Sequence, residues 1–175
     1  DPEAPQGESS GNITFIRGRA ESVPLNDDSV DVITSIHVFE HLRDPLGALS
    51  ECRRLLSPGG YLLIMAPNKY HPPVLLSRML PHRLRQILNR SATGTGQDDT
   101  FPAYYRANCM RAMRRLGQCA GLECMTVQYV SNHPEYMMFS VTAYRLAVLV
   151  ERNLLRRSAL AWLRHLLFAR FRKPS

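Results

Sequence analysis

Apolar residues along the chain fall into short runs that turn-forming residues separate. Two runs, Asn12–Arg17 and Val30–Ile36, are rich in β-branched and aromatic residues, and the turn residues Asn26–Ser29 lie between them. Both runs are predicted to be buried strands. Tyr61–Met65 is almost continuously apolar, which is typical of a strand in a parallel sheet that is covered on both faces.

Helical spacing follows the second run. Asp44 is placed to cap a helix that begins at Pro45, because a short acidic side chain accepts from the unpaired amides of a first turn. Apolar residues recur on one face through Leu49 and Leu56, and Ser57–Gly60 is predicted to end the helix. Strand, strand, helix and strand with short connections require a parallel sheet covered by helices, so the predicted fold class is α/β.

The pattern loosens between Asn68 and Pro102, where prolines interrupt apolar pieces and Ser91–Thr100 is a polar loop. Such a segment typically lies over a binding site. Helical spacing then returns over Asn108–Ala120, and Leu122–Val130 alternates as a strand does.

The last part of the chain is predicted to be mainly helical. Val141–Leu155 has helical spacing, Ala159–Leu163 continues helically, and Leu166–Phe171 fits either a last strand or the end of that helix. We therefore divide the chain into a core at residues 1–130 and a basic helical tail at residues 131–175, which ends in the last strand of the sheet if that alternative holds.

Charge separates this tail from the rest. The 175 residues are 45% apolar and 21% charged, as in an ordinary globular domain, and the net charge is +7. From Arg145 onward, eight basic residues stand against the single acid Glu151, so residues 145–175 carry the whole surplus. The sequence has no basic face with interleaved aromatic residues, so a nucleic-acid partner is not expected. Either the tail packs on the sheet and ends in a strand near Phe171, which we favour, or it lies on an anionic bilayer.

The cysteines and the lengths of the apolar runs indicate a cellular compartment. Four cysteines without C-x-x-C spacing, three of them in apolar runs, favour buried thiols in a reducing environment over disulfide or metal roles. No apolar run reaches the ~20 residues that span a bilayer. A cytoplasmic protein is predicted, with membrane association through the tail left open. The cysteines are Cys52, Cys109, Cys119 and Cys124.

Three stretches together resemble class I S-adenosylmethionine-dependent methyltransferases of the group that includes quinone-biosynthesis enzymes. They are GRAESVPLNDDSVDVITSIHVFEHLRDP at 18–45, RRLLSPGGYLLIMAPN at 53–68 and FPAYYRAN at 101–108. The resemblance covers residues 12 to about 130 and implies a Rossmann-like doubly wound sheet with an antiparallel carboxy-terminal edge. The family's glycine-rich turn has no counterpart in this sequence, so the domain is expected to lack its first strand and helix. Asp1 then resembles the family's ribose-binding acid.

The resemblance implies S-adenosylmethionine as cofactor. Ligands of open α/β sheets bind outside the carboxyl ends of the strands, so the loops that follow the strands are the candidate site. By resemblance, the loop after the family's third strand passes the adenine, and the residues after the fourth strand line the methionine end and face the acceptor. These residues are Arg19, Ala20 and Glu21 for the adenine, and Ser35, Ile36 and His37 for the methionine end.

His37 and His41 are the candidate catalytic residues. An imidazole with a pKa of ~6.5 can take a proton from an acceptor hydroxyl as the methyl group transfers. A purely positioning role for His37 stays open, since many members of this fold act by holding the reacting atoms in line. Glu40 and His41 fit a structural role equally, closing the turn onto the next helix.

An acceptor pocket is expected over residues of about 69–106, an insertion in the core. An arginine beside paired tyrosines suits an anionic or hydroxylated acceptor, although the tyrosines fit ordinary packing equally well. The candidate acceptor residues are Asn68, Tyr70, His71, Tyr104, Tyr105 and Arg106.

The residues from His37 to His41 also spell H-x-x-E-H, a metalloprotease pattern that needs a helix. Here the pattern follows a strand directly, and Asp44 and Pro45 interrupt it within a turn, so a protease is not expected. By resemblance, a divalent metal at this cluster with His71 is left open. No metal ligand is predicted.

The expected function is methyl transfer to an oxygen, nitrogen or carbon of a small-molecule or lipid-linked acceptor. The alternatives are a non-catalytic binding module of methyltransferase fold and a membrane-surface adaptor. Because the glycine-rich turn is missing, these 175 residues alone are expected to bind the cofactor poorly or not at all and to be inactive.

Overall fold

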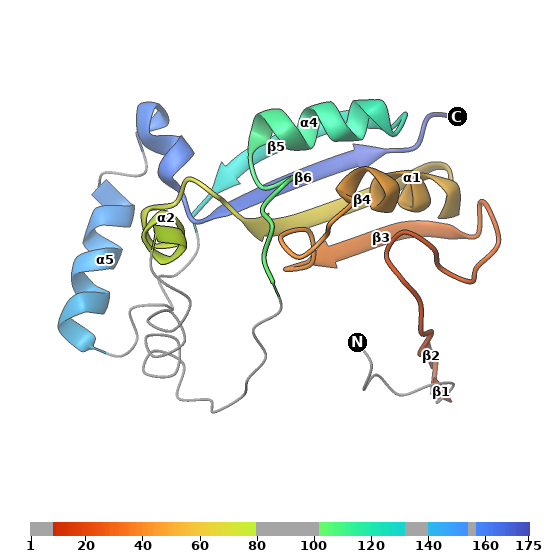
Figure 1. Cartoon of the computed structure of the whole chain (residues 1–175), viewed down its shortest axis with the longest axis horizontal. Coiled ribbons are helices and arrows are strands. Elements are labelled where there is room, and N and C mark those ends of the chain that lie inside the picture. The colour runs from red at the N-terminus through yellow and green to blue at the C-terminus, as the bar shows by residue number, and fades with distance from the viewer. Residues whose placement is uncertain (1–8, 80–101, 132–139, 154–156) are drawn as a thin grey trace.

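A computed structural model of the protein describes residues 9–79, 102–131, 140–153 and 157–175, whose main feature is a four-stranded sheet (Figure 1). The spatial order is β3 (Val30–Ile36), β4 (Leu56–Pro67), β6 (Leu166–Arg172) and β5 (Glu123–Val130). Strands β3 and β4 are parallel, whereas β6 is antiparallel to both β4 and β5. The predicted α/β class with an antiparallel carboxy-terminal edge is therefore confirmed.

Helix α1 (Pro45–Leu55) begins as predicted, because Asp44 Oδ1 accepts a hydrogen bond from the Gly47 amide at 3.0 Å. Its predicted end is wrong. The helix stops at Leu55, and the next residues already belong to β4. Gly60 lies where β3 comes close, since an added Cβ would be 2.8 Å from the Asp31 carbonyl oxygen. The glycine therefore lets the two strands approach instead of ending the helix.

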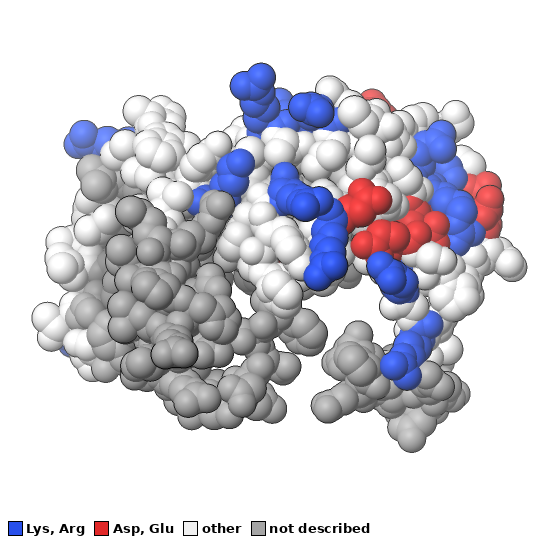
Figure 2. Space-filling model, viewed as in Figure 1, with Lys and Arg blue, Asp and Glu red and all other residues white. Residues whose placement is uncertain are grey.

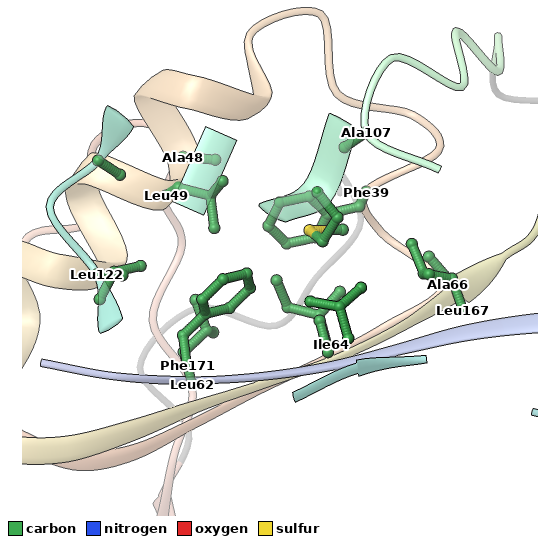
Figure 3. Close-up of a cluster of buried hydrophobic side chains, with 14 of the residues drawn as sticks. Phe39, Ala48, Leu49, Leu62, Ile64, Ala66, Ala107, Leu122, Leu167 and Phe171 are labelled. Carbon is green, nitrogen blue, oxygen red and sulfur yellow. The ribbon is translucent and has the colours of Figure 1, made fainter. Parts of the chain in front are cut away.

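Helices α1 and α4 (Met110–Cys119) lie over the same face of the sheet (Figure 1). Leu62 and Ile64 of β4 and Phe171 of β6 point from the sheet towards these helices and are almost fully buried (Figure 3). Gly117 of α4 faces Phe171 so closely that an added Cβ would be 2.2 Å from the ring. The helices and the sheet thus share one close-packed core.

The predictions of buried strands near the start of the chain are wrong. Within Asn12–Arg17, only β2 (Ile13–Thr14) is a strand, and it pairs with β1 (Ser9–Ser10) outside the main sheet. Ile13 is 58% exposed. Strand β3 forms as predicted, but among the described strands it pairs with β4 alone, and Ile36 at its end is 58% exposed. β-Branched composition predicts an extended chain without saying what will cover it.

The tail separates into a part that enters the sheet and a part that does not. Strand β6 lies between β4 and β5, so the predicted final strand is confirmed. Helix α5 (Val141–Asn153), the 3₁₀ helix η2 (Ser158–Leu163) and α2 (Pro72–Met79) lie near the end of the sheet where β3 and β4 finish (Figure 1). Within the described chain, no helix is long and apolar enough to cross a membrane.

The four cysteines are free thiols with different environments. Cys109 is buried as predicted, whereas Cys119 is exposed, so the prediction of buried thiols fails there. Cys52 and Cys124 are half-buried. Burial raises the pKa of the Cys52 thiol to about 11, which keeps it protonated at neutral pH.

Candidate active site at the carboxyl ends of β3 and β4

The carboxyl ends of β3 and β4 lie together because the two strands are parallel, and the Ile36–Met65 pairing closes their ladder. His37 follows β3 directly, and its amide donates to the Met65 carbonyl at 2.9 Å. The backbone then turns with a positive φ of 55° at His37, a conformation that costs free energy for a residue other than glycine. The turn carries the His37 ring away from the strand with about half of its side chain exposed.

Glu40 lies beneath two histidines. Its side chain is 5% exposed, and Oε1 is 3.4 Å from His37 Nδ1 and 3.9 Å from His41 Nε2. Within the described chain, Oε2 is buried without a hydrogen-bond partner. A carboxylate beside Nδ1 favours the His37 tautomer that carries its proton on Nδ1, which leaves the Nε2 lone pair available to accept a proton.

The loop after β3 is joined to residues 102–106. The Glu40 carbonyl accepts from the Tyr104 amide at 2.7 Å and from the Tyr105 amide at 3.2 Å. His41 Nδ1 lies 3.3 Å from the Pro102 carbonyl, which favours the tautomer that donates to it. The structure therefore brings together the predicted catalytic histidines and the predicted acceptor tyrosines, which are about sixty residues apart in the sequence.

Two arginines enclose Tyr104. Arg43 Nε donates to the Tyr104 hydroxyl at 2.6 Å, and Arg106 Nη1 donates to the Arg43 carbonyl at 2.5 Å. Both guanidinium carbons lie near the Tyr104 ring, at 5.4 Å for Arg43 and 5.7 Å for Arg106. Arg43 was not predicted, and its only signal in the sequence was its place in the same loop. These contacts commit the Tyr104 hydroxyl to the fold, while the Arg106 side chain remains exposed.

Asn68 is fully buried at the end of β4 and fastens the tail there. Its Nδ2 donates to the Trp162 and Arg164 carbonyls at 2.6 and 2.8 Å, and its Oδ1 accepts from the Tyr70 amide at 3.0 Å. The predicted acceptor role of Asn68 stays a prediction, but its side chain is already used by the fold. Asn108, which was not predicted, likewise donates to the Pro67 carbonyl at 2.9 Å.

The predicted acceptor residues Tyr70 and His71 differ in exposure. Tyr70 is 39% exposed, its ring centroid lies 6.4 Å from that of Trp162 in a T-shaped arrangement, and Lys69 Nζ lies 5.0 Å from its ring centroid. His71 is buried, and its ring lies 4.9 Å from that of His165. Burial, with a smaller contribution from His165, lowers the pKa of His71 to about 4, so the ring is neutral at physiological pH.

The predicted adenine loop lies against the first turn of α1. The Arg19 and Ser22 backbones pair with each other at 3.1 and 3.0 Å, and Arg19 contacts Glu21 at 3.6 Å. A Cβ added at Gly47 would be 3.5 Å from Glu21 Cγ. The loop therefore lies beside the helix that follows the His37–His41 turn, as binding of one cofactor by both would require. Asp1, the predicted ribose-binding residue, lies outside the described residues, as does the predicted loop Ser91–Thr100.

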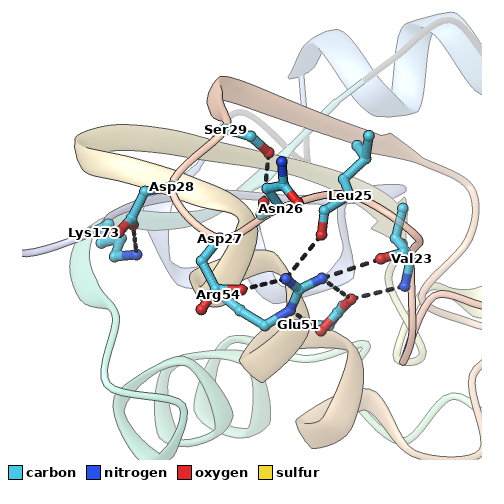
Figure 4. A network of polar contacts seen from close by, with 9 residues as sticks. All are labelled: Val23, Leu25, Asn26, Asp27, Asp28, Ser29, Glu51, Arg54 and Lys173. Carbon is cyan, nitrogen blue, oxygen red and sulfur yellow. Dashed lines mark hydrogen bonds and ion pairs between the residues drawn. The ribbon is translucent and has the colours of Figure 1, made fainter.

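A polar network centred on Arg54 and Glu51 of α1 binds the residues that follow the adenine loop (Figure 4). Arg54 donates to Glu51, to Asp27 and to the Val23 and Leu25 carbonyls, while Glu51 accepts from the Val23 amide at 2.7 Å. The hydrogen bonds from Arg54 and Val23 lower the pKa of Glu51 to about 2. The network fixes the chain between the adenine loop and β3 onto α1.

No group of three residues that could hold a metal ion occurs within the described ranges. The H-x-x-E-H residues form bends and turns and not a helix, so they lack the geometry of a metalloprotease.

Sequence comparison finds relatives of one kind. Residues 3–64 match the family described as "Methyltransferase domain". The chain is 46% identical over 142 residues to a Mycolicibacterium smegmatis protein named "Probable S-adenosylmethionine-dependent methyltransferase", and the match covers 76% of this chain and 55% of that protein. A Marinomonas protein named "Ubiquinone/menaquinone biosynthesis C-methyltransferase UbiE" is 37% identical over 86 residues, which cover 45% of this chain and 34% of that protein.

Structural comparison agrees on the fold. A Haloferax volcanii protein solved in complex with the Trm112 methyltransferase activator has a TM-score of 0.59 at 18% identity, over 96% of this chain and 64% of that one. The strand order and this likeness define a Rossmann-like methyltransferase fold. The family match and the M. smegmatis relative support a class I S-adenosylmethionine-dependent methyltransferase. The chain spans about half the length of the M. smegmatis relative.

Proposed function

We propose that the protein transfers the methyl group of S-adenosylmethionine to a small-molecule or lipid-linked acceptor, with the loop after β3 at the reacting end. The observation that carries the proposal is the His37 ring, half-exposed at the carboxyl end of β3 with its Nδ1 3.4 Å from buried Glu40. The similarity to the family supports S-adenosylmethionine as the cofactor, and the names of the relatives support methyl transfer as the reaction class.

The residues present fit such a cofactor. Among the described residues, the Ala20 and Glu21 amides have no hydrogen-bond partner and can bind an adenine ring edge. Ile36 and Val38 at the end of β3 are 58% and 41% exposed and offer apolar contact. When bound, S-adenosylmethionine supplies an electrophilic methyl group on a sulfonium.

The role of His37 follows from its neighbours. Transfer to a hydroxyl releases one proton, and the His37 Nε2 can take it because Glu40 favours the proton on Nδ1. Glu40 also joins this loop to residues 104 and 105 through its carbonyl, so the base and the acceptor side move together. We propose Tyr70, Tyr105 and Arg106 as acceptor contacts, and leave Asn68 and Tyr104 outside the site because the fold uses their polar groups.

The test uses the full-length protein with tritiated S-adenosylmethionine and two probes, a polyprenylated hydroquinone and the same ring without its chain. His37→Ala should lower turnover by about 10²–10⁴ and leave cofactor affinity nearly unchanged. Ala20→Leu should weaken cofactor binding more than turnover, once circular dichroism shows that it folds, because Ala20 also packs against the core. Gln118→Ala, at an exposed position of α4 away from the reacting end, is the control.

The outcomes separate the hypotheses. Equal loss of cofactor binding in both variants would remove His37 from the acceptor side. Cofactor binding without transfer to either probe would favour the binding module, and transfer only to the polyprenylated ring would identify a lipid-linked acceptor.

A further inference from the structure

Helix α5 turns an apolar face outward. Its described exposed residues include three apolar side chains on one side, whereas Tyr144 and Val148 on the opposite side are half-buried. A surface helix normally turns its apolar stripe towards the core. An exposed apolar face is therefore unusual for a helix that contacts only its own chain. The three are Leu146 at 62%, Leu149 at 58% and Val150 at 40% exposure. The prediction that Leu146 and Leu149 pack on the sheet is therefore wrong.

Basic side chains accompany this face. Arg145 lies exposed on α5, and Arg157 lies exposed at the start of η2. Between Arg145 and Arg157, the sequence has four basic residues and the single acid Glu151. On the face drawn in Figure 2, the acidic side chains gather at the end away from α5. The surface therefore combines exposed leucine with a local excess of positive charge.

Trp162 continues the same surface towards the candidate active site. It is 48% exposed, and its ring edge meets Tyr70 at the end of β4. Asn68 donates hydrogen bonds to the Trp162 and Arg164 carbonyls, so the segment that carries Trp162 is fixed to the end of β4. Indole rings favour the boundary between water and hydrocarbon, because one edge is polar and the remainder is apolar.

We propose that α5 and Trp162 dock on an anionic bilayer surface. Leucine and tryptophan would enter the acyl boundary, and the arginines would lie at the level of the head groups. Charge complementarity selects the bilayer over a second copy of this chain, because a copy would bring the exposed Arg145 and Arg157 of both chains together. A lipid-linked acceptor would then reach the strand ends directly from the bilayer, and this consequence alone rests on the proposed function.

The test is sedimentation of the full-length protein, without cofactor, with vesicles of phosphatidylglycerol and phosphatidylcholine or of phosphatidylcholine alone. Binding is expected to the anionic vesicles and to fall steeply between 0.1 and 1 M NaCl, as the Debye length falls from ~10 to ~3 Å. Arg145→Gln should weaken it about fivefold, and Leu146→Ser/Leu149→Ser should abolish it. Ile13→Ser/Phe15→Ser removes exposed apolar residues elsewhere and should bind as the wild type does.

Three results would overturn the proposal. These are no binding to anionic vesicles, binding that Leu146→Ser/Leu149→Ser leaves unchanged, and a dimer in light scattering that the same double variant dissociates. Circular dichroism checks that each variant folds. Since no cofactor is present, failure of methyl transfer would not affect this result.

Discussion

The two faces of the sheet differ in how completely they are covered. Leu62 and Ile64 on one face of β4 are buried beneath α1 and α4, whereas Leu63 and Met65 on the other face are half-exposed. All four residues are equally apolar, so the sequence of β4 does not distinguish the faces. Only the position of α1 and α4 distinguishes the two faces. A strand that is apolar on both faces is typical of a sheet that is covered on both faces. The described helices cover only one of them.

The largest expected effect tests this difference with neighbouring residues. Leu62→Ala should lower the free energy of unfolding by about 2–5 kcal/mol, because it leaves a cavity in the closed core. Leu63→Ala should cost about 1 kcal/mol, because the solvent already reaches that face. Urea unfolding measures the free energy of unfolding of each variant, and an unchanged m-value shows that the two values can be compared. Equal losses would mean that the second face is as closed as the first.

A second prediction extends the comparison to a buried polar residue, His71. Its pKa is about 4 in the folded chain and ~6.5 when unfolded, so the unfolded chain binds the extra proton. Stability is therefore unaffected above pH 6.5 and is lost as pH falls towards 4, by up to about 3 kcal/mol. His71→Gln should flatten this part of the pH profile measured by urea unfolding. The same steep loss in His71→Gln would assign it to another group, such as His165.

The smallest expected effect concerns the contact between α4 and β6. Gly117→Ala should cost about 1–3 kcal/mol, because the added Cβ would lie 2.2 Å from the Phe171 ring. Combining it with Phe171→Leu should cost less than the sum of the two single variants, since the smaller side chain makes room. Additive costs in thermal unfolding would show that the ring moves aside freely.

Much of the fold could be predicted because periodicity and caps are local. The sequence placed β3, α1, α4, β5 and the final strand, and the Asp44 cap is as expected. Asn12–Arg17 was wrong because β-branched residues favour an extended chain without fixing its partner. Helix α5 was predicted, but its orientation was not, since helical spacing shows that apolar residues share a face and does not show whether that face meets the sheet or the solvent.

The site was partly predictable for a topological reason. Residues that follow parallel strands must meet at one edge, and this rule brought His37 and His41 to the expected place. What the sequence could not show is which polar groups the fold itself uses. Nothing distinguishes buried Glu40 from a surface acid, and the commitment of the Asn68 amide to Trp162 joins residues that are 94 apart in the sequence.

The most direct test of the account is a titration of S-adenosylhomocysteine into the ¹⁵N-labelled 175-residue chain, followed residue by residue by nuclear magnetic resonance. We predict weak binding, with a Kd above the micromolar range, because the family's glycine-rich turn has no counterpart in these 175 residues. We also predict that the shifts are confined to Arg19–Glu21 and Ser35–His37. Shifts elsewhere or micromolar affinity would contradict the proposed position of the cofactor site.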